Sequence, residues 1–254
     1  MAEARRWLDH LAAVGRELGQ GLLQLLYPGR CLLCGQDLPP DRPHFCDPCR
    51  SALLTDPFLS CPRCAGKVGP YAITDGGCVA CRGESFGFEE VLRLGPYEGV
   101  LREAILRLKR HTGEGLAELL GELWAERDAP RFQALRAEVI VPVPLHWRRR
   151  WQRGYNQSQA VAWGLSHRLG LPCQPAWLRR VRHTPSQTRQ TPTGRKENVR
   201  GAFATGRGAR LGGRRVLLVD DVMTTGATAS EAARALRTAG AARVAVAVLA
   251  RAQG

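Results

Sequence analysis

One short segment, residues 216–239, constrains the fold more than any other part of this chain. It begins with four apolar residues, continues through two acids into a turn that contains threonine and glycine, and ends in an alanine-rich helical pattern. A buried strand that passes through such a turn into a helix is the repeating unit of parallel α/β sheets. The C-terminal half repeats this alternation, with strands expected at 139–143, 215–219 and 243–249 and helices at about 156–168 and 227–239. The sequence therefore predicts a central parallel sheet flanked by helices.

The turn in this segment has the chemistry of a phosphate site. Backbone N–H groups at the start of a helix, together with the helix dipole, attract an anion, and Gly226 lets the backbone come close to it. Asp220 and Asp221 would repel a phosphate, but they suit neutral ribose hydroxyls, with Mg²⁺ as a helper. The simpler alternative, a helix cap by Thr225 or Thr228, needs only one hydroxyl. We therefore predict Asp220 and Asp221 as catalytic residues, followed by a phosphate-binding loop of Val222, Met223, Thr224, Thr225, Gly226, Ala227 and Thr228.

Eight of the nine cysteines form four Cys-x-x-Cys pairs. Two such pairs supply the four thiolates of a tetrahedral Zn²⁺ site, which leaves no open coordination position, so the metal is expected to be structural. A disulfide framework is the alternative, but the rest of the chain looks cytosolic, and disulfides are rare in that compartment. Sequential pairing closes shorter loops than a cross-brace and is preferred for that reason. The predicted ligands of two zinc ions are Cys31, Cys34, Cys46, Cys49, Cys61, Cys64, Cys78 and Cys81.

These patterns divide the chain into three predicted parts. They are an amphipathic helix at 1–28, a double zinc ribbon at 29–84 and an α/β domain at 85–254, in which a hairpin is expected at 91–99 and one helix from about 100 to 127. No apolar run has the length of a membrane span or the pattern of a signal core, which favours a cytoplasmic protein. Contact of the N-terminal helix with the inner face of the membrane is an alternative to simple packing.

Positive charge is concentrated in the C-terminal half. The net charge of +14 arises from residues 101–254, which hold 27 Lys and Arg against 11 Asp and Glu. Residues 144–215 alone hold 16 basic residues and one acid, Glu197. Such a block either binds an anion or forms a solvated face, and its one-sided charge favours an anionic ligand. Trp147 and Trp151 lie within the block and could stack on nucleic-acid bases.

The segment 216–228 resembles the phosphoribosyl pyrophosphate (PRPP) signature of type I phosphoribosyltransferases, because every defined position of that signature is met. The chain as a whole resembles the ComF (ComFC) competence family still more closely. The features that agree in order cover about residues 25–250, and the Arg-Gly-Tyr-Asn-Gln element among them is specific to the family. They are the cysteine pairs after Leu25-Leu26-Tyr27-Pro28, then Tyr97-Glu98-Gly99, Leu106-Arg107-Leu108-Lys109, Val141-Pro142-Val143-Pro144-Leu145, Arg153-Gly154-Tyr155-Asn156-Gln157, Gln187-Thr188, Arg195, Asn198-Val199, Ala202-Phe203 and the PRPP loop.

This resemblance implies a type I phosphoribosyltransferase fold with an N-terminal zinc-ribbon domain, and a site that binds PRPP with Mg²⁺. It implies that a loop at residues 146–154 receives the pyrophosphate, with Arg148, Arg149, Arg150 and Arg153 as its cations. It also implies a mobile lid at residues 183–203, with Gln187, Arg189, Arg195 and Asn198 as the residues that close over PRPP. Asn156 is expected either to cap the helix that it precedes or to touch the substrate.

In the cell, the resemblance implies a role in natural transformation. The protein would handle internalised single-stranded DNA together with a ComFA-type helicase and a recombination mediator. Two alternatives stay open. One is an active phosphoribosyltransferase of nucleotide salvage, and the other is a catalytically inactive scaffold that binds DNA or protein. The sequence identifies no pocket for an acceptor substrate.

Overall fold

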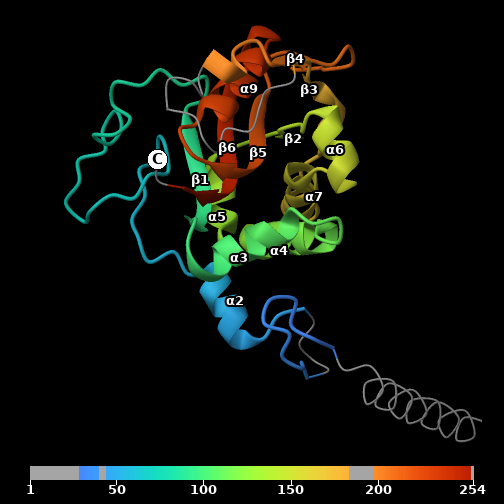
Figure 1. The fold of residues 1–254 in the computed structure, drawn as a ribbon. Helices are drawn as coiled ribbons and strands as arrows, with labels where there is room; N and C mark the ends of the chain where they lie inside the picture. Colours follow the sequence, from blue (N-terminus) through green and yellow to red (C-terminus); the bar gives the residue numbers. More distant parts are fainter. Residues whose placement is uncertain (1–28, 40–43, 183–196, 253–254) are drawn as a thin grey trace, which may run out of the picture. The chain divides into compact units, whose positions relative to one another are not determined.

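The computed structural model describes residues 29–39, 44–182 and 197–252 (Figure 1). The helix predicted at 1–28 lies outside the described residues, as do Gln187, Arg189 and Arg195 of the predicted lid. The chain divides into two compact units, residues 1–52 and 53–254, which are described separately. The boundary between them falls within helix α2 (Asp47–Leu54).

The larger unit is built on a four-stranded sheet in which every pair of neighbours is parallel. Its strand order is β1-β6-β5-β2. The strands are β1 (Glu90–Pro96), β2 (Val139–Pro142), β5 (Arg215–Met223) and β6 (Arg243–Arg251). All four residues of β2 are buried, as are residues 244–250 of β6, because helices cover both faces of the sheet. The predicted parallel sheet is confirmed.

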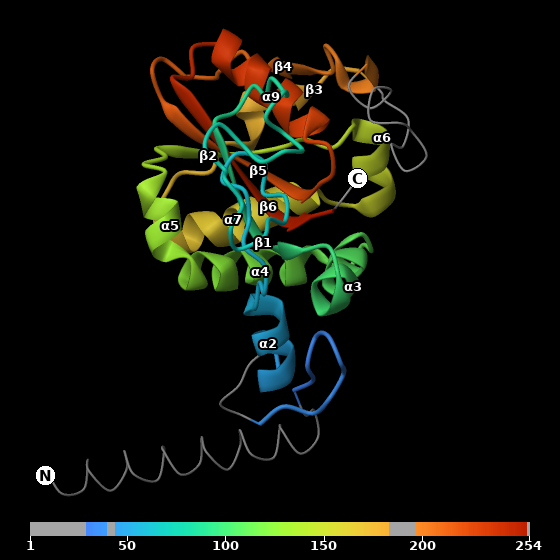
Figure 2. The same ribbon diagram turned by 90° about the vertical axis from the view of Figure 1, so that its left-hand side faces the viewer.

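Helices lie on both sides of this sheet (Figure 2). Helix α9 (Ala227–Thr238) packs on one face, whereas α7 (Gln157–Leu169) packs on the other and is itself covered by α4 (Glu114–Arg127). Glycines allow α4 and α7 to touch, because a Cβ atom at Gly164 would lie 2.0 Å from the carbonyl oxygen of Glu118. The other helical segments here are α3 (Gly99–Leu108), α5 (Ala129–Ala134), α6 (Trp147–Arg153) and the 3₁₀ turn η1 (Pro175–Trp177).

Two predictions for residues 91–127 are wrong. The expected hairpin at 91–99 does not form, because β1 pairs in parallel with β6, far away in the sequence, and the turn after it leads directly into α3. The single helix expected from 100 to 127 is interrupted between α3 and α4. Gly113 lies at this break, where a Cβ atom would lie only 2.6 Å from the hydroxyl oxygen of Tyr155. The backbone therefore turns where no side chain fits.

A small antiparallel pair of strands, β3 (Leu178–Arg180) and β4 (Phe203–Thr205), lies beside α9; β3 precedes the predicted lid in sequence, and β4 begins at its last residue. Their pairing brings the two ends of that segment together. In the part of the chain that the structure describes, no helix has both the length and the apolar character needed to cross a bilayer.

Candidate phosphoribosyl site

The predicted phosphate loop lies at the carboxyl end of β5 and the start of α9. Strand β5 runs further than expected, through Asp220 and Asp221 to Met223, and it pairs with β6 over this extension. The order of strand, acids, turn and helix is the one the sequence predicts. Ligands of parallel α/β sheets bind at the carboxyl ends of the strands, so the loop lies where such a sheet binds its ligand.

The turn depends on Gly226, which occupies the N-cap position of α9 with a φ of +80°. Neither Thr225 nor Thr228, the alternative caps, occupies the N-cap position: Thr225 precedes it, and Thr228 lies inside α9. A Cβ atom at Gly226 would also lie 3.3 Å from Cε1 of Phe86, whose ring stacks on Phe88. Glycine adopts this backbone conformation without strain, and it leaves the aromatic ring where it is.

The two acids of the loop are held by hydrogen bonds. Oδ1 of Asp220 accepts a hydrogen bond from the Ser158 hydroxyl in α7 at 2.9 Å and another from the Asp221 amide at 2.9 Å. Oδ1 of Asp221 accepts from the Val222 amide at 2.8 Å. Burial and the neighbouring Asp221 carboxylate raise the pKa of Asp220 to about 7. A carboxyl group with this pKa can accept or donate a hydrogen bond to a sugar hydroxyl near neutral pH.

A cavity of about 280 Å³ opens beside this loop. Thr225, Ala227 and Ser230 form one side of it, along the start of α9. The Thr225 hydroxyl accepts a hydrogen bond of 3.4 Å from the Ala227 amide. The cavity's other lining residues are Gly83, Glu84, Ser85, Phe86, Val199, Glu231 and Arg234. The first turn of the helix is therefore accessible from a recess whose lining mixes hydroxyl, charged and apolar side chains.

The loop expected at residues 146–154 to receive pyrophosphate is a helix instead, α6, and this prediction of its conformation is wrong. Its run of arginine and glutamine favours a helix, and Gly154, with a φ of +80°, ends it. Arg150 is exposed, and Arg153 lies in the last turn. The side chains of Arg148 and Arg149 lie outside the part of the structure that is described.

The chain after α6, residues 154–158, leads to Ser158, whose hydroxyl donates to Asp220. Asn156 stands at the N-cap of α7, but its side chain does not cap the helix; its Nδ2 donates to the carbonyl of Val143 at 3.1 Å. The buried Tyr155 hydroxyl donates to the carbonyl of Leu108, at the end of α3. Sequence reasoning missed the contact of Ser158 with Asp220. The sequence offers one signal for it: Ser158 directly follows the Arg-Gly-Tyr-Asn-Gln element, in the first turn of the expected helix.

Of the four residues predicted to close over PRPP, Asn198 alone lies within the described residues, in a helical turn at 197–199. Its carbonyl oxygen accepts a hydrogen bond of 2.8 Å from Nη2 of Arg182. The assignment of the lid as a whole stays a prediction.

The cysteine pairs form two clusters, and the preferred sequential pairing is confirmed. In each cluster the four sulfur atoms all lie within 4.8 Å of one another. Sulfur–sulfur distances of 3.6 Å for Cys64–Cys78 and 3.8 Å for Cys61–Cys81 match four sulfurs placed about 2.3 Å from one tetrahedral ion, which are about 3.8 Å apart. The first cluster is Cys31, Cys34, Cys46 and Cys49, and the second is Cys61, Cys64, Cys78 and Cys81.

Backbone N–H groups favour the thiolate form of one cysteine in each cluster. Burial raises the pKa of the Cys61 thiol, but backbone N–H groups, among them that of Cys78 at 3.3 Å from the sulfur, lower it to about 7. In the first cluster, burial is likewise outweighed by backbone N–H groups, including that of Cys46 at 3.4 Å, and the pKa of Cys31 falls to about 6. Burial and the neighbouring cysteines raise the pKa of Cys49 and of Cys64 instead, so a cation is needed to hold all four sulfurs of a cluster as thiolates, and the four-sulfur geometry fits Zn²⁺ in that role.

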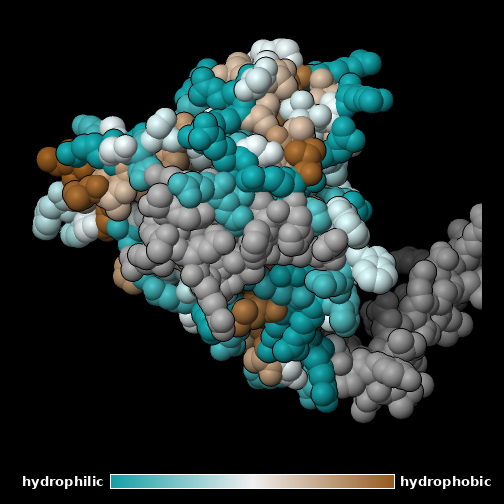
Figure 3. Space-filling view, turned by 45° about the horizontal axis from the view of Figure 1, so that its top comes forward, coloured by the Kyte–Doolittle hydropathy of each residue, from teal (hydrophilic) through white to brown (hydrophobic). Residues whose placement is uncertain are grey.

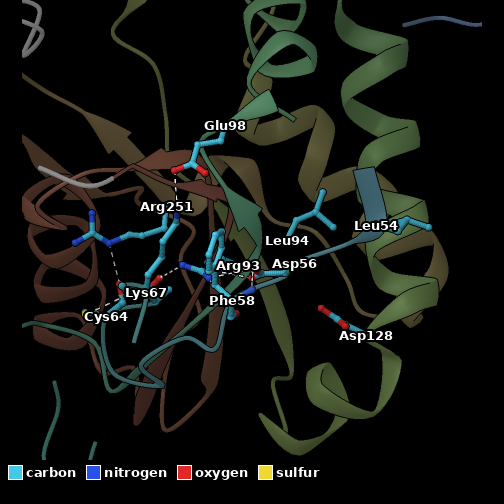
Figure 4. A network of polar contacts seen from close by, with 12 residues as sticks. Leu54, Asp56, Phe58, Cys64, Lys67, Arg93, Leu94, Glu98, Asp128 and Arg251 are labelled. Atoms are coloured by element: carbon cyan, nitrogen blue, oxygen red, sulfur yellow. Dashed lines mark hydrogen bonds and ion pairs between the residues drawn. The ribbon is translucent and has the colours of Figure 1, made fainter. Parts of the chain in front are cut away.

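Arginines of β1 and β6 attach the second cluster to the sheet (Figure 4). Arg93 is 1% exposed; its guanidinium donates to both carboxylate oxygens of Asp56, at 2.8 and 3.1 Å, and to the carbonyl of Ala65 at 2.7 Å. Arg251 donates to the carbonyl of Cys64 at 3.0 Å and to that of Met223 at 3.3 Å. One side chain therefore joins the second cluster to the phosphate loop.

Known proteins resemble this chain over most of its length. The phosphoribosyl transferase domain model matches residues 157–254. Competence protein F of Haemophilus influenzae is 33% identical over 227 residues, which are 88% of this chain and 97% of that protein. DNA utilization protein YhgH of Escherichia coli K12 is 33% identical over 225 residues, with coverage of 87% and 96%. Competence protein ComFC of Bacillus subtilis is 27% identical over 243 residues, with coverage of 88% and 93%.

Proposed function

Since this chain belongs to the competence protein F family, we propose that it binds PRPP or another ribose 5-phosphate group and acts in DNA uptake by handling internalised single-stranded DNA. The observation that carries the first half of this proposal is the loop at the end of β5. There, two hydrogen-bonded acids precede a glycine-capped helix start that borders a cavity.

In the proposed complex the 5-phosphate lies on the amides and hydroxyls of residues 224–228, where the dipole of α9 favours an anion. Asp220 and Asp221 accept hydrogen bonds from the ribose hydroxyls, and Ser158 holds the first of these acids in place. The arginines of α6 face the pyrophosphate, and the segment at 183–203 closes over it. Mg²⁺ bound with PRPP would neutralise part of the diphosphate charge.

The second half of the proposal rests on charge and on the relatives. The similar proteins are a competence protein and a DNA utilization protein. The block at 144–215 has the composition of a surface that neutralises a phosphate backbone. In Figure 3, hydrophilic residues cover much of the described part of this face, with hydrophobic patches among them. A ComFA-type helicase and a recombination mediator are the proposed protein partners, and the cytoplasm is the proposed compartment.

Zn²⁺ is proposed for both cysteine clusters, with a structural role. Each cluster offers four sulfurs, so no coordination position is left for substrate. The proposed domain boundaries are those of the sequence: the helix at 1–28, the zinc ribbons at 29–84 and the phosphoribosyltransferase-like domain at 85–254.

An active phosphoribosyltransferase is the second candidate, favoured by the completeness of the loop. Pyrophosphate would leave C1 of PRPP as an acceptor attacks, and the protein would contribute positioning and charge stabilisation without a covalent nucleophile. Release of pyrophosphate that depends on an added base or amine would establish this activity. Binding of PRPP without release of pyrophosphate would indicate a protein that binds PRPP but does not turn it over.

Calorimetric titration of Mg²⁺–PRPP into the zinc-loaded protein tests the proposed ligand. Micromolar binding is expected, with a loss of at least tenfold in Asp221→Asn and in Thr225→Ala. Asp37→Asn is the matched control, because that carboxylate is 67% exposed and lies in the smaller unit, where it pairs with Arg30. No binding to the wild-type protein, or equal binding by all variants, would refute a ligand site at residues 220–228.

A further inference from the structure

Helix α6 presents two exposed indole rings on one face. Trp147 is 64% exposed and Trp151 is 86% exposed. The residues are four positions apart, so their side chains are neighbours on the helix surface, about 6 Å apart at Cβ. Together with Arg150 and Gly154 they line a shallow, open recess of about 570 Å³. This recess is separate from the cavity beside Thr225, with which it shares no lining residue.

The charge around the indoles favours one kind of occupant. By sequence, all four charged residues of α6 are arginines, and no Asp or Glu occurs anywhere from residue 144 to residue 196. A purely apolar partner would gain nothing from this charge, and inorganic phosphate would gain nothing from the indoles. Single-stranded nucleic acid offers both a flat, unpaired base face and a phosphate charge for every nucleotide.

The position of α6 places this surface at the ligand-binding end of the sheet. Helix α6 follows the carboxyl end of β2 in the chain, and β2 pairs in parallel with β5. Because the carboxyl ends of parallel strands lie at the same edge of a sheet, α6 begins near the end of β5 that carries the acids. Beyond its last residue the chain passes through the buried Tyr155 to Ser158, which holds Asp220. Single-stranded nucleic acid bound on α6 would therefore lie beside the proposed phosphoribosyl site.

We infer that Trp147, Trp151 and Arg150 form a stacking surface for single-stranded nucleic acid. Bases lie against the two indoles, and the guanidinium engages the phosphodiester backbone. The inference rests on the proposed handling of single strands and specifies the residues that carry it. Because every base has a π face, the surface accepts any sequence, which suits a protein that receives DNA of arbitrary origin.

Fluorescence anisotropy with a labelled oligothymidylate tests the stacking surface. Removal of one base stack costs about 1–3 kcal/mol, so Trp151→Ala should weaken binding about 5- to 150-fold, and Trp151→Phe should restore most of the loss. The dependence of log affinity on log salt should keep its slope in Trp151→Ala, because no phosphate contact is lost. In Arg150→Gln the magnitude of the slope should fall by about 0.7.

Tyr71→Ala is the matched control, because Tyr71 is an aromatic residue that is 96% exposed outside α6. It should bind the oligonucleotide as the wild-type protein does. Since both indoles of α6 are largely exposed, the unfolding midpoint of each variant should match that of the wild type.

The outcomes separate this inference from the proposed function. Salt-dependent binding by the wild type with no loss in Trp151→Ala, or a loss that Trp151→Phe does not restore, would overturn the stacking surface and leave DNA handling intact. No binding of single strands by the wild type would overturn both. An abasic oligonucleotide provides the last criterion: wild type and Trp151→Ala should bind it equally, and a difference would contradict stacking.

Discussion

Replacement of Gly226 by alanine is the sharpest test of the way the loop is built. An L-residue in the left-handed region that Gly226 occupies, at φ +80°, costs about 1–2 kcal/mol. The new methyl group would also lie 3.3 Å from Cε1 of Phe86, which must move by a few tenths of an ångström. We expect a total loss of about 1–3 kcal/mol in the free energy of unfolding, so the protein stays folded.

Urea unfolding followed by circular dichroism measures this loss, and calorimetry with Mg²⁺–PRPP measures the effect on the loop. Binding should fall at least tenfold, because the amides of the turn no longer point at one phosphate position. Gly208→Ala is the matched control, since a Cβ atom there meets nothing within 4 Å and its φ is not positive. A Gly226→Ala protein with wild-type stability and wild-type PRPP binding would refute this account of the turn.

Three further changes test other parts of the structure. Arg93→Met leaves the carboxylate of Asp56 without its cation and should lower the free energy of unfolding by about 3–5 kcal/mol, because this pair is buried. Arg30→Gln breaks a pair whose two side chains are each more than 60% exposed, and it should cost less than about 1 kcal/mol. Equal losses of the two variants in chemical denaturation would contradict the importance of burial. Cys61→Ser should release one zinc and weaken PRPP binding at least tenfold, because Arg251 joins the second cluster to the loop. Cys31→Ser should also release one zinc but leave PRPP binding unchanged. Metal analysis and calorimetry measure these effects, and equal PRPP binding by the two variants would contradict the coupling. The pKa of Asp220 is raised to about 7, so the stability that its protonated form contributes is complete below about pH 4 and is lost as the pH rises through 7. Asp220→Asn should therefore stabilise the unliganded protein at pH 8 by at most about 4 kcal/mol, and it should abolish PRPP binding. An unfolding midpoint at pH 8 that does not rise would contradict the raised pKa.

The features that sequence predicts well here are local ones. The strand, the acids, the turn and the helix of residues 215–239 follow one another along the chain, so their order alone specifies the unit. The pairing of the cysteines is local too, because the shortest loops join consecutive pairs. In both cases the chemistry and the geometry depend on residues close together in sequence.

The features that sequence reasoning missed depend on distant partners. The turn residues after β1 fit a hairpin as well as they fit a passage into a helix, and the choice is made by β6, which lies about 150 residues later. Arg93 looks like a surface charge until Asp56 and the carbonyl groups around it are known. Likewise, the hydrogen bond of Ser158 to Asp220 joins residues that are 62 positions apart.

The central claim is that residues 216–228 hold a ribose 5-phosphate group, and backbone-amide NMR of the zinc-loaded protein tests it most directly. During titration with ribose 5-phosphate, the amide signals of residues 224–228 should shift with one saturable curve, and the shifts should disappear in Asp221→Asn or in Gly226→Ala. Ribose without phosphate should leave these signals in place. If the amides of residues 224–228 stay unchanged while signals elsewhere respond, the ligand binds at another site and the account of the loop is wrong.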